Sequence, residues 1–184
     1  MRGVTNHLFQ RRSHMMRVSK LLLALLCVSA VTFGTYKVVL SHCEIPCGIY
    51  GDTTRIDLLY EDVATIEKSM AQIVALSAAK PVNANQLIRW VGNKEEHANK
   101  VQHVVTQYFM TQRVKSKATG AKGYDKYVTQ LTTLHGMLIH AMKAKQTTDV
   151  EHCKHLRSLI DQFAAAYLSP EDLEHVRKAH GKHG

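Results

Sequence analysis

The chain has 184 residues, enough for one modest domain and a leader, and its apolar fraction of 45% is ordinary for a globular protein. Its formal net charge of +9 is uneven, because six of the 24 basic residues and no acidic residue lie within residues 1–41, leaving 18 basic against 15 acidic residues beyond them. A remainder so nearly balanced, without a basic stripe interleaved with aromatic residues, argues against a nucleic-acid partner.

Residues 1–41 are predicted to be a leader. A basic region ends at Lys20, an apolar run covers residues 21–33, and a short stretch covers residues 34–41. This is the order of a cleavable secretory-type signal. The apolar run is short for a bilayer span, although its extension to Leu40 leaves a retained membrane anchor open. Because an acid-free start also suits organelle import, we expect an exported or organellar protein whose compartment the sequence leaves open.

Residues 42–52 (HCEIPCGIYGD), here called the hook, fit no helical pattern. If the leader is cut after Ser41, His42 gains a free α-amine with a pKa near ~7.7–8, which a metal can deprotonate around neutral pH. The amine, the Cys43 amide nitrogen and the thiolates of Cys43 and Cys47 then form a square-planar N2S2 set, with the His42 imidazole within reach as an axial ligand. Such donors suit Ni(II) or Cu(II), whereas zinc prefers a tetrahedron.

The hook also favours redox chemistry. A deprotonated amide and two thiolates donate strongly, which makes Ni(III) accessible and allows one-electron cycling. Pro46 restricts the turn between the cysteines, and Gly48 lets the chain leave that turn through a positive φ. Tyr50 can then place its hydroxyl over the open axial face. The segment therefore predicts a redox-active metal site.

Four stretches beyond the hook carry apolar residues every three or four positions, the pattern of an amphipathic helix. They span residues 56–73, 87–109, 127–142 and 153–167, and no stretch alternates in the manner of a strand. Short links leave each helix beside its predecessor. The chain is therefore predicted to be all-α, an antiparallel up-down-up-down four-helix bundle over about residues 53–168, preceded by the irregular metal-binding hook.

Breakers and caps mark the predicted helix ends. Pro81 stops the first helix, and the Gly/Lys-rich stretch 115–123 ends the second. The fourth helix is expected to open with Thr148 or Asp149 as its N-cap.

Residues 169–184 are predicted to form a short tail helix and a His-rich end. Ser169 is a suitable cap, with Pro170 at the first helical position and acidic residues in the first turn. The tail histidines have the composition to scavenge nickel, but a mobile solvated tail is the simpler interpretation. They are His175, His180 and His183.

The nine residues His-Cys-Glu-Ile-Pro-Cys-Gly-Ile-Tyr, directly after a leader, resemble the nickel hook of the nickel superoxide dismutases. Residues 55–57 (RID) resemble the step that follows it, and a weaker likeness continues through residues 94–97 and 107–109 to about Tyr167. The resemblance implies the precursor of an enzyme that converts superoxide to oxygen and hydrogen peroxide by Ni(II)/Ni(III) cycling, with one nickel ion per chain. It also implies a helical-bundle domain over residues 42–184, a homohexamer, and a maturation protease that exposes the histidine.

The resemblance also assigns roles by position. The ligands would be His42 through its amine and imidazole, Cys43 through its thiolate and amide, and Cys47 through its thiolate. Tyr50 would guard the cavity through which superoxide approaches.

Four further residues would surround the metal ligands. Glu44 and Ile49 would line the substrate cavity. Some members of the family hold the axial imidazole through a glutamate and an arginine, a pattern from which this sequence departs. Asp57 is the candidate for the carboxylate here, and His97 is the candidate for its partner.

Simpler readings of the same residues remain open. Cys43 and Cys47 could form a small disulfide loop, or join a distant histidine in a mononuclear zinc or copper site. Cys153, with His152 and His155 beside it, could belong to a second metal site, but its place on an apolar stripe favours a buried thiol.

The histidines of the helical stretches are expected to be surface or core-edge residues. They are His103, His135, His140, His152 and His155. A non-enzymatic alternative also remains, an exported helical bundle that binds or carries a metal at its amino terminus. A redox-active Ni(III) signal would separate the enzyme from such a carrier.

Overall fold

The computed structural model describes residues 51–181, and all regular structure in that range is helical. The elements are α2 (Asp52–Ala78), α3 (Ala84–His103), the π-helix η1 (Val104–Arg113), α4 (Tyr124–Gln146), α5 (Glu151–Tyr167) and α6 (Pro170–His180). The all-α prediction is thus confirmed, while the predicted leader lies outside the described residues. Over 51–181 no helix combines the length and the apolar character needed to cross a membrane.

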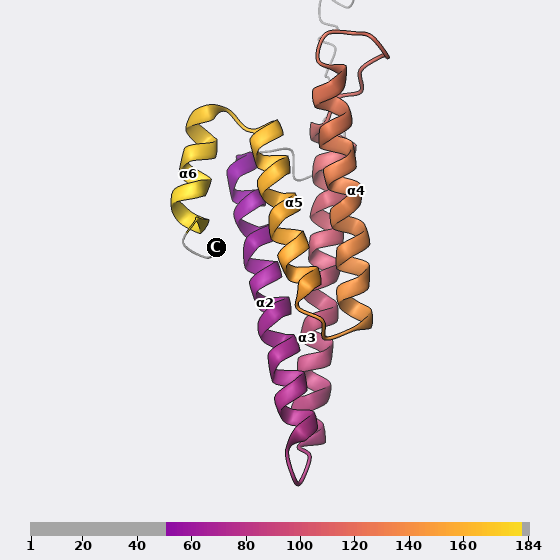
Figure 1. Cartoon of the computed structure of the whole chain (residues 1–184), viewed down its shortest axis with the longest axis vertical. Helices are drawn as coiled ribbons and strands as arrows, with labels where there is room; N and C mark the ends of the chain where they lie inside the picture. The colour runs from indigo at the N-terminus through magenta and orange to yellow at the C-terminus, as the bar shows by residue number, and fades with distance from the viewer. Residues whose placement is uncertain (1–50, 182–184) are drawn as a thin grey trace, which may run out of the picture. The chain divides into compact units, whose positions relative to one another are not determined.

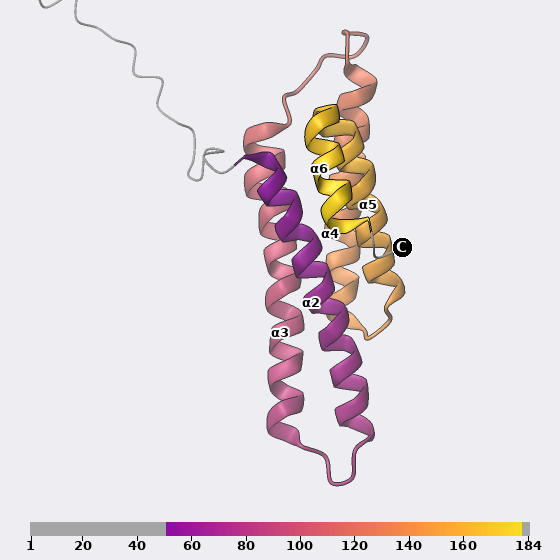
Figure 2. The same cartoon turned by 90° about the vertical axis from the view of Figure 1, so that its left-hand side faces the viewer.

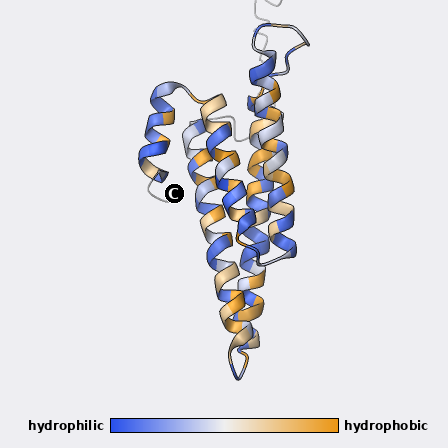
Figure 3. Cartoon of the chain, in the orientation of Figure 1, coloured by the Kyte–Doolittle hydropathy of each residue, from blue (hydrophilic) through white to orange (hydrophobic). Residues whose placement is uncertain are grey.

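The helices are stabilised because an apolar stripe on each is buried in the core. On α2, Ile56, Leu59, Val63, Ile66 and Met70 are fully buried, and their spacing of three or four residues puts them on one face. The stripes of the other helices meet this face in a single core. Figure 3 shows the apolar colour turned toward the interior where the helices pack together.

The main helices are neighbours in chain order. α2 packs against α3, α3 against α4, and α4 against α5, while α5 returns to α2. Figures 1 and 2 show these helices running side by side, with the chain reversing direction at each connection. After α5 the chain reverses once more, and α6 lies against the outside of α2 (Figure 1).

The second predicted helix is longer and less regular than expected. It begins at Ala84, where the Asn83 side chain accepts a hydrogen bond from the Gln86 amide, and it turns into η1 at Val104. In a π-helix the backbone hydrogen bonds span five residues instead of four. Two side chains follow the same wider spacing, because Thr111 donates to the carbonyl of Thr106 and Gln112 to that of Gln107.

The predicted helix ends hold with one exception. α2 stops before Pro81, and Ser169 caps α6 by accepting a hydrogen bond from the Asp172 amide. The predicted N-cap of α5 is wrong by one or two residues, because Val150 occupies that position. The Asp149 side chain instead accepts a hydrogen bond from the Glu151 amide at 3.0 Å, so it stabilises the start of the helix from one residue earlier.

The hairpin of α2 and α3 extends past the ends of α4 and α5 (Figures 1 and 2). Apolar side chains near its end are exposed, among them Val74 at 55% and Ile88 at 71%. The sequence from Lys68 to Lys94 contains no acidic residue. The end of the hairpin therefore presents an apolar surface without negative charge.

Candidate metal centre

The predicted metal ligands lie just before the described part of the chain. Outside it are the six hook residues that the sequence singles out, namely His42, Cys43, Glu44, Cys47, Ile49 and Tyr50. The structure therefore shows the region to which the hook is attached. That region begins at Gly51, immediately after Tyr50.

The carboxylate of Asp52, the first residue of α2, binds three side chains from distant parts of the chain. Tyr108 donates its hydroxyl to Oδ1 at 2.5 Å. Arg113 Nη2 and the Tyr167 hydroxyl donate to Oδ2 at 2.7 and 2.6 Å. Because Tyr108 and Arg113 belong to η1 and Tyr167 to α5, this one carboxylate fastens the end of the hook to two other helices.

Hydrogen bonding and burial fix the charge states of this cluster. Burial of Asp52 would raise the pKa of its carboxyl, but hydrogen bonds from Arg113, Tyr108 and Tyr167 outweigh it, and the pKa is lowered. Burial and the hydrogen bond to Asp52 raise the pKa of Tyr108 to about 12. The same two causes raise the pKa of Tyr167. The carboxylate is therefore charged at neutral pH, and both tyrosines keep their protons.

A cavity of about 460 Å³ opens beside this cluster, at the point where the hook joins α2. Gly51, Asp52 and Arg113 contribute to its wall. Gly51 has a φ of 79°, which favours glycine because a side chain would be strained there. The Nε atom of Arg113 is buried and has no hydrogen-bond partner in the part of the chain that the structure covers.

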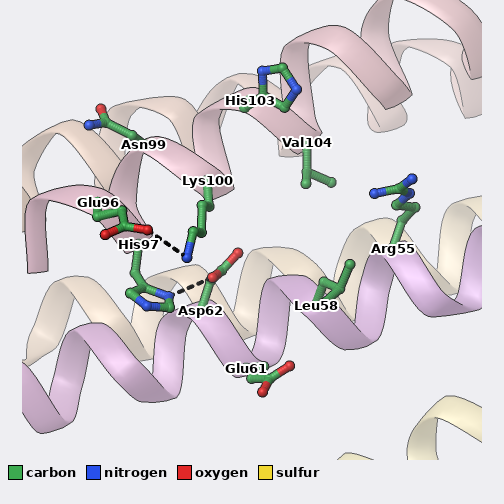
Figure 4. Close-up of a pocket in the computed structure, with 10 residues that line it drawn as sticks. All are labelled: Arg55, Leu58, Glu61, Asp62, Glu96, His97, Asn99, Lys100, His103 and Val104. Carbon is green, nitrogen blue, oxygen red and sulfur yellow. Dashed lines mark hydrogen bonds and ion pairs between the residues drawn. The ribbon is translucent and has the colours of Figure 1, made fainter. Parts of the chain in front are cut away.

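A second cavity of about 580 Å³ lies between α2 and the α3–η1 segment, and Figure 4 shows its lining. At one end His97 Nδ1 donates to Asp62 Oδ1 at 2.7 Å. Burial raises the pKa of the Asp62 carboxyl, and the hydrogen bond from His97 opposes that rise. Arg55 lies toward the other end (Figure 4), and its guanidinium stands 5.1 Å from the centre of the Tyr108 ring. Arg55 thus links the lining of this second cavity to Tyr108, one of the three side chains that bind Asp52.

The structure pairs Asp57 and His97 with other partners than the sequence suggested. Asp57 Oδ1 receives a hydrogen bond from His180 Nε2 on α6 at 2.8 Å, whereas His97 binds Asp62. Asp57 and Asp62 are five residues apart, so they point to different sides of α2. The described side chains therefore do not pair His97 with Asp57, and the roles of the two residues at the metal site stay predictions.

The tail histidine His180 is docked rather than free. Besides its contact with Asp57, its ring stacks on Tyr60 with the ring centres 4.3 Å apart. The prediction of a mobile solvated tail is wrong for this residue. His175 is exposed on the same helix, and His183 lies outside the described residues.

Cys153 is a buried thiol, as its place on the apolar stripe indicated. It is fully buried, and its Sγ lies 3.8 Å from the Sδ of Met70 in the core. Burial raises the pKa of the thiol to about 11. A protonated thiol directed at a core methionine is not available to a metal on the surface.

Sequence reasoning missed the polar residues that organise this end of the molecule. The sequence pattern places Tyr108 and Tyr167 in apolar helical stretches and Asp52 at the last position of the hook, and it predicts no hydrogen bond among them. No sequence pattern pointed to a role for Arg113, since it follows the last apolar position of its helix. The position of Asp62 did indicate a buried partner, because an acidic residue directly before the core residue Val63 lies at the edge of a buried face and needs a hydrogen-bond donor.

Comparison with known proteins assigns a family to this arrangement. The model of a family described as nickel-containing superoxide dismutase matches residues 37–170. The matched segment includes the hook and every helix from α2 to α5. Neither the curated proteins nor the solved structures contain a match to the chain.

Proposed function

This chain belongs to the family of nickel-containing superoxide dismutases, and we propose that its nickel ion is held by His42, Cys43 and Cys47 once the leader is removed. As a member of that family it is an oxidoreductase that contains nickel and acts on superoxide. The observation that carries the proposal is that the family match includes a His-Cys-x-x-Pro-Cys segment, which directly follows the predicted leader.

The donors of the hook fit nickel. An amine, a backbone amide nitrogen and two thiolates are the strong nitrogen and sulfur donors that planar Ni(II) accepts, and an imidazole can serve as a further ligand. When bound, nickel supplies one-electron cycling between Ni(II) and Ni(III), which serves the two half-reactions that turn superoxide into oxygen and into hydrogen peroxide.

Each residue of the hook has its own task. Cleavage before His42 converts its nitrogen from an amide, which binds metals poorly, into an amine with a pKa near ~7.7–8. Tyr50 guards the approach of superoxide, and Glu44 and Ile49 line it. Solvent, the Tyr50 hydroxyl or a ligand thiol provides the protons that peroxide formation consumes.

The contacts of Asp52 with Tyr108, Arg113 and Tyr167 support the proposal, because they fix the position of the last residue of the hook. Only Gly51 separates Tyr50 from a carboxylate that is bound to three side chains of η1 and α5. A short segment gains precision when its end is immobilised, because a metal site tolerates little error in the positions of its ligands.

Asp57 stays our candidate for the carboxylate that orients the axial imidazole. It lies on the first turns of α2, close to the hook in sequence, and its present partner is an imidazole, that of His180. We propose that the His42 imidazole shares or takes over this contact in the mature enzyme. His97 would then have a different role, which is to hold the Asp62 side chain in the wall of the neighbouring cavity by a hydrogen bond.

We further propose that the packed helices are the antiparallel four-helix bundle of the family and that they assemble into a homo-oligomer, a hexamer by family resemblance. The exposed apolar end of the α2–α3 hairpin, with Val74, Val82 and Ile88, supports association with further copies. A dedicated protease would remove the leader before the nickel site forms.

The decisive experiment compares two proteins that differ by one residue. The first begins at His42, and the second retains Ser41 ahead of it, so that the terminal amine becomes an amide. We expect the first to bind one nickel per chain and to disproportionate superoxide in stopped-flow assays. The second should be inactive, because its planar donor set lacks the amine.

Electron paramagnetic resonance of the two proteins adds an independent readout. A Ni(III) signal only in the protein that begins at His42 supports the enzyme, whereas nickel bound without such a signal would support the alternative of a metal carrier. Equal activity with Ser41 retained would overturn the proposed ligand set.

A further inference from the structure

Three histidines from two neighbouring helices lie together at the surface, away from the hook. His140 belongs to α4, and His152 and His155 belong to the first turns of α5. A spacing of three residues puts His152 and His155 on one side of α5. Because α4 and α5 pack side by side (Figures 1 and 2), the rings meet across the contact between the helices.

One distance within this cluster suits two ligands of the same metal ion. The Nδ1 atoms of His140 and His152 are 3.3 Å apart, and the ring centres of His140 and His155 are 4.5 Å apart. Two nitrogens at ~2.0–2.1 Å from a tetrahedral ion are separated by about 3.3–3.4 Å. The same separation also allows a hydrogen bond between the two rings when no ion is bound.

A neutral imidazole is the form that binds a metal ion, whereas an imidazolium repels a cation. The nearest acidic residue on α5 is Glu151, which is bound to Lys154 at 2.5 Å.

We propose that His140, His152 and His155 form a second divalent-cation site, separate from the hook, for an ion that prefers imidazole, such as Zn²⁺. As the side chains stand, no three potential ligands within residues 51–181 converge on one point. His140 and His152 therefore supply the first two ligands. His155 is exposed and reaches the ion by rotating about its own side-chain bonds, and water completes the tetrahedron.

This site would not be a structural centre of the fold. Its ligands lie at the rim of the α4–α5 contact, outside the core formed by residues such as Leu134 and Leu156. Cys153 takes no part, because its thiol contacts Met70 in the core. Zinc binding should therefore leave the helical structure unchanged and alter only the environment of the three imidazoles.

The test uses the full chain with Cys43→Ser and Cys47→Ser, so that the hook thiolates cannot take up zinc. Zn²⁺ is titrated in competition with a chromogenic indicator, first into this protein and then into the same protein carrying His152→Gln. We expect the substitution to weaken zinc binding by at least about tenfold, the order that even loss of a supporting hydrogen bond costs a metal site.

The matched control is His135→Gln, which removes an exposed histidine from α4 outside the cluster. It should bind zinc as its parent does. Nuclear magnetic resonance of the imidazole groups gives a second readout, in which zinc should shift the signals of His140 and His152. Zinc binding that survives His152→Gln, or that falls equally in His135→Gln, overturns the proposal, as do unshifted imidazole signals at saturating zinc.

Discussion

Arg113 donates from Nη2 to Oδ2 of Asp52 at 2.7 Å, and this contact joins the last residue of η1 to the first residue of α2. Tyr108 and Tyr167 complete the coordination of the same carboxylate. The position where the hook ends is therefore among the most firmly held points at this end of the molecule.

Asp52→Asn should destabilise the protein. The substitution removes the charge that Arg113 faces, and the tyrosine hydroxyl that then meets the amide NH2 group loses its acceptor. We expect the free energy of unfolding to fall by about 1–3 kcal/mol, measured by chemical denaturation of the metal-free protein. The matched control is Asp125→Asn, in the first turn of α4, where the side chain is exposed. A loss as large in the control would deny any special role to the Asp52 cluster.

The contribution of Asp52 should depend on pH. Because the pKa of the carboxyl is lower in the folded protein than in the unfolded chain, Asp52 stabilises the fold fully above its unfolded pKa of about 3.9. That contribution disappears as the pH falls through the lower folded pKa. The stability difference between the wild type and Asp52→Asn should therefore shrink below about pH 4, and a constant difference down to pH 2 would contradict the charge assignment.

His42→Ala should abolish most dismutase activity while part of the nickel remains bound. The α-amine, the amide and both thiolates survive this substitution, and only the axial imidazole is lost. Cys47→Ser should instead remove the planar site, because a hydroxyl is a poor ligand for nickel. Nickel analysis and stopped-flow decay of superoxide measure the two effects, and full turnover in His42→Ala would refute the axial role.

Lys94→Met should destabilise the end of α4. Lys94 is only 4% exposed, and its Nζ donates to the carbonyls of Ala144, Lys145 and Thr147 at 2.8, 2.6 and 3.0 Å. These are among the carbonyls that the end of an α-helix leaves without partners. Because methionine matches the length but offers no donor, we expect a loss of about 1.5–3 kcal/mol in chemical denaturation.

Lys100→Met is the matched control for Lys94→Met. Lys100 lies on the same helix, but its side chain is exposed and forms an ion pair with Glu96. Replacement there should leave the unfolding midpoint nearly unchanged, since exposed ion pairs contribute little. Equal shifts in the two variants would show that the carbonyl contacts of Lys94 do not stabilise the fold.

His180→Gln should loosen α6. His180 holds the end of this helix to α2 through Asp57 and through stacking on Tyr60. We expect faster amide hydrogen exchange along α6 and unchanged exchange in the core of α2. His175→Gln, an exposed position on the same helix, should leave exchange as in the wild type. If α6 stays equally protected in His180→Gln, the docking rests on other contacts.

The helices were predictable because each is indicated by residues close together in the sequence. The spacing of Ile56, Leu59 and Val63 identifies the buried face of α2 without reference to any other element, and Ser169 marks the start of α6 as its N-cap. The change from α3 to η1 at Val104 was not predictable, because an apolar residue every three or four positions suits both kinds of helix.

The sequence by itself determined the proposal for the metal centre, because the candidate donors of the hook follow one another within six residues and need no distant partner. Tertiary structure alone decided which side chains bind Asp52, at the end of the hook, and which acidic residues His97 and His180 face. Asp52 meets Tyr108, Arg113 and Tyr167 from positions 56, 61 and 115 residues away. Such pairings depend on how the packed helices are rotated and shifted against one another, and no local pattern encodes that rotation.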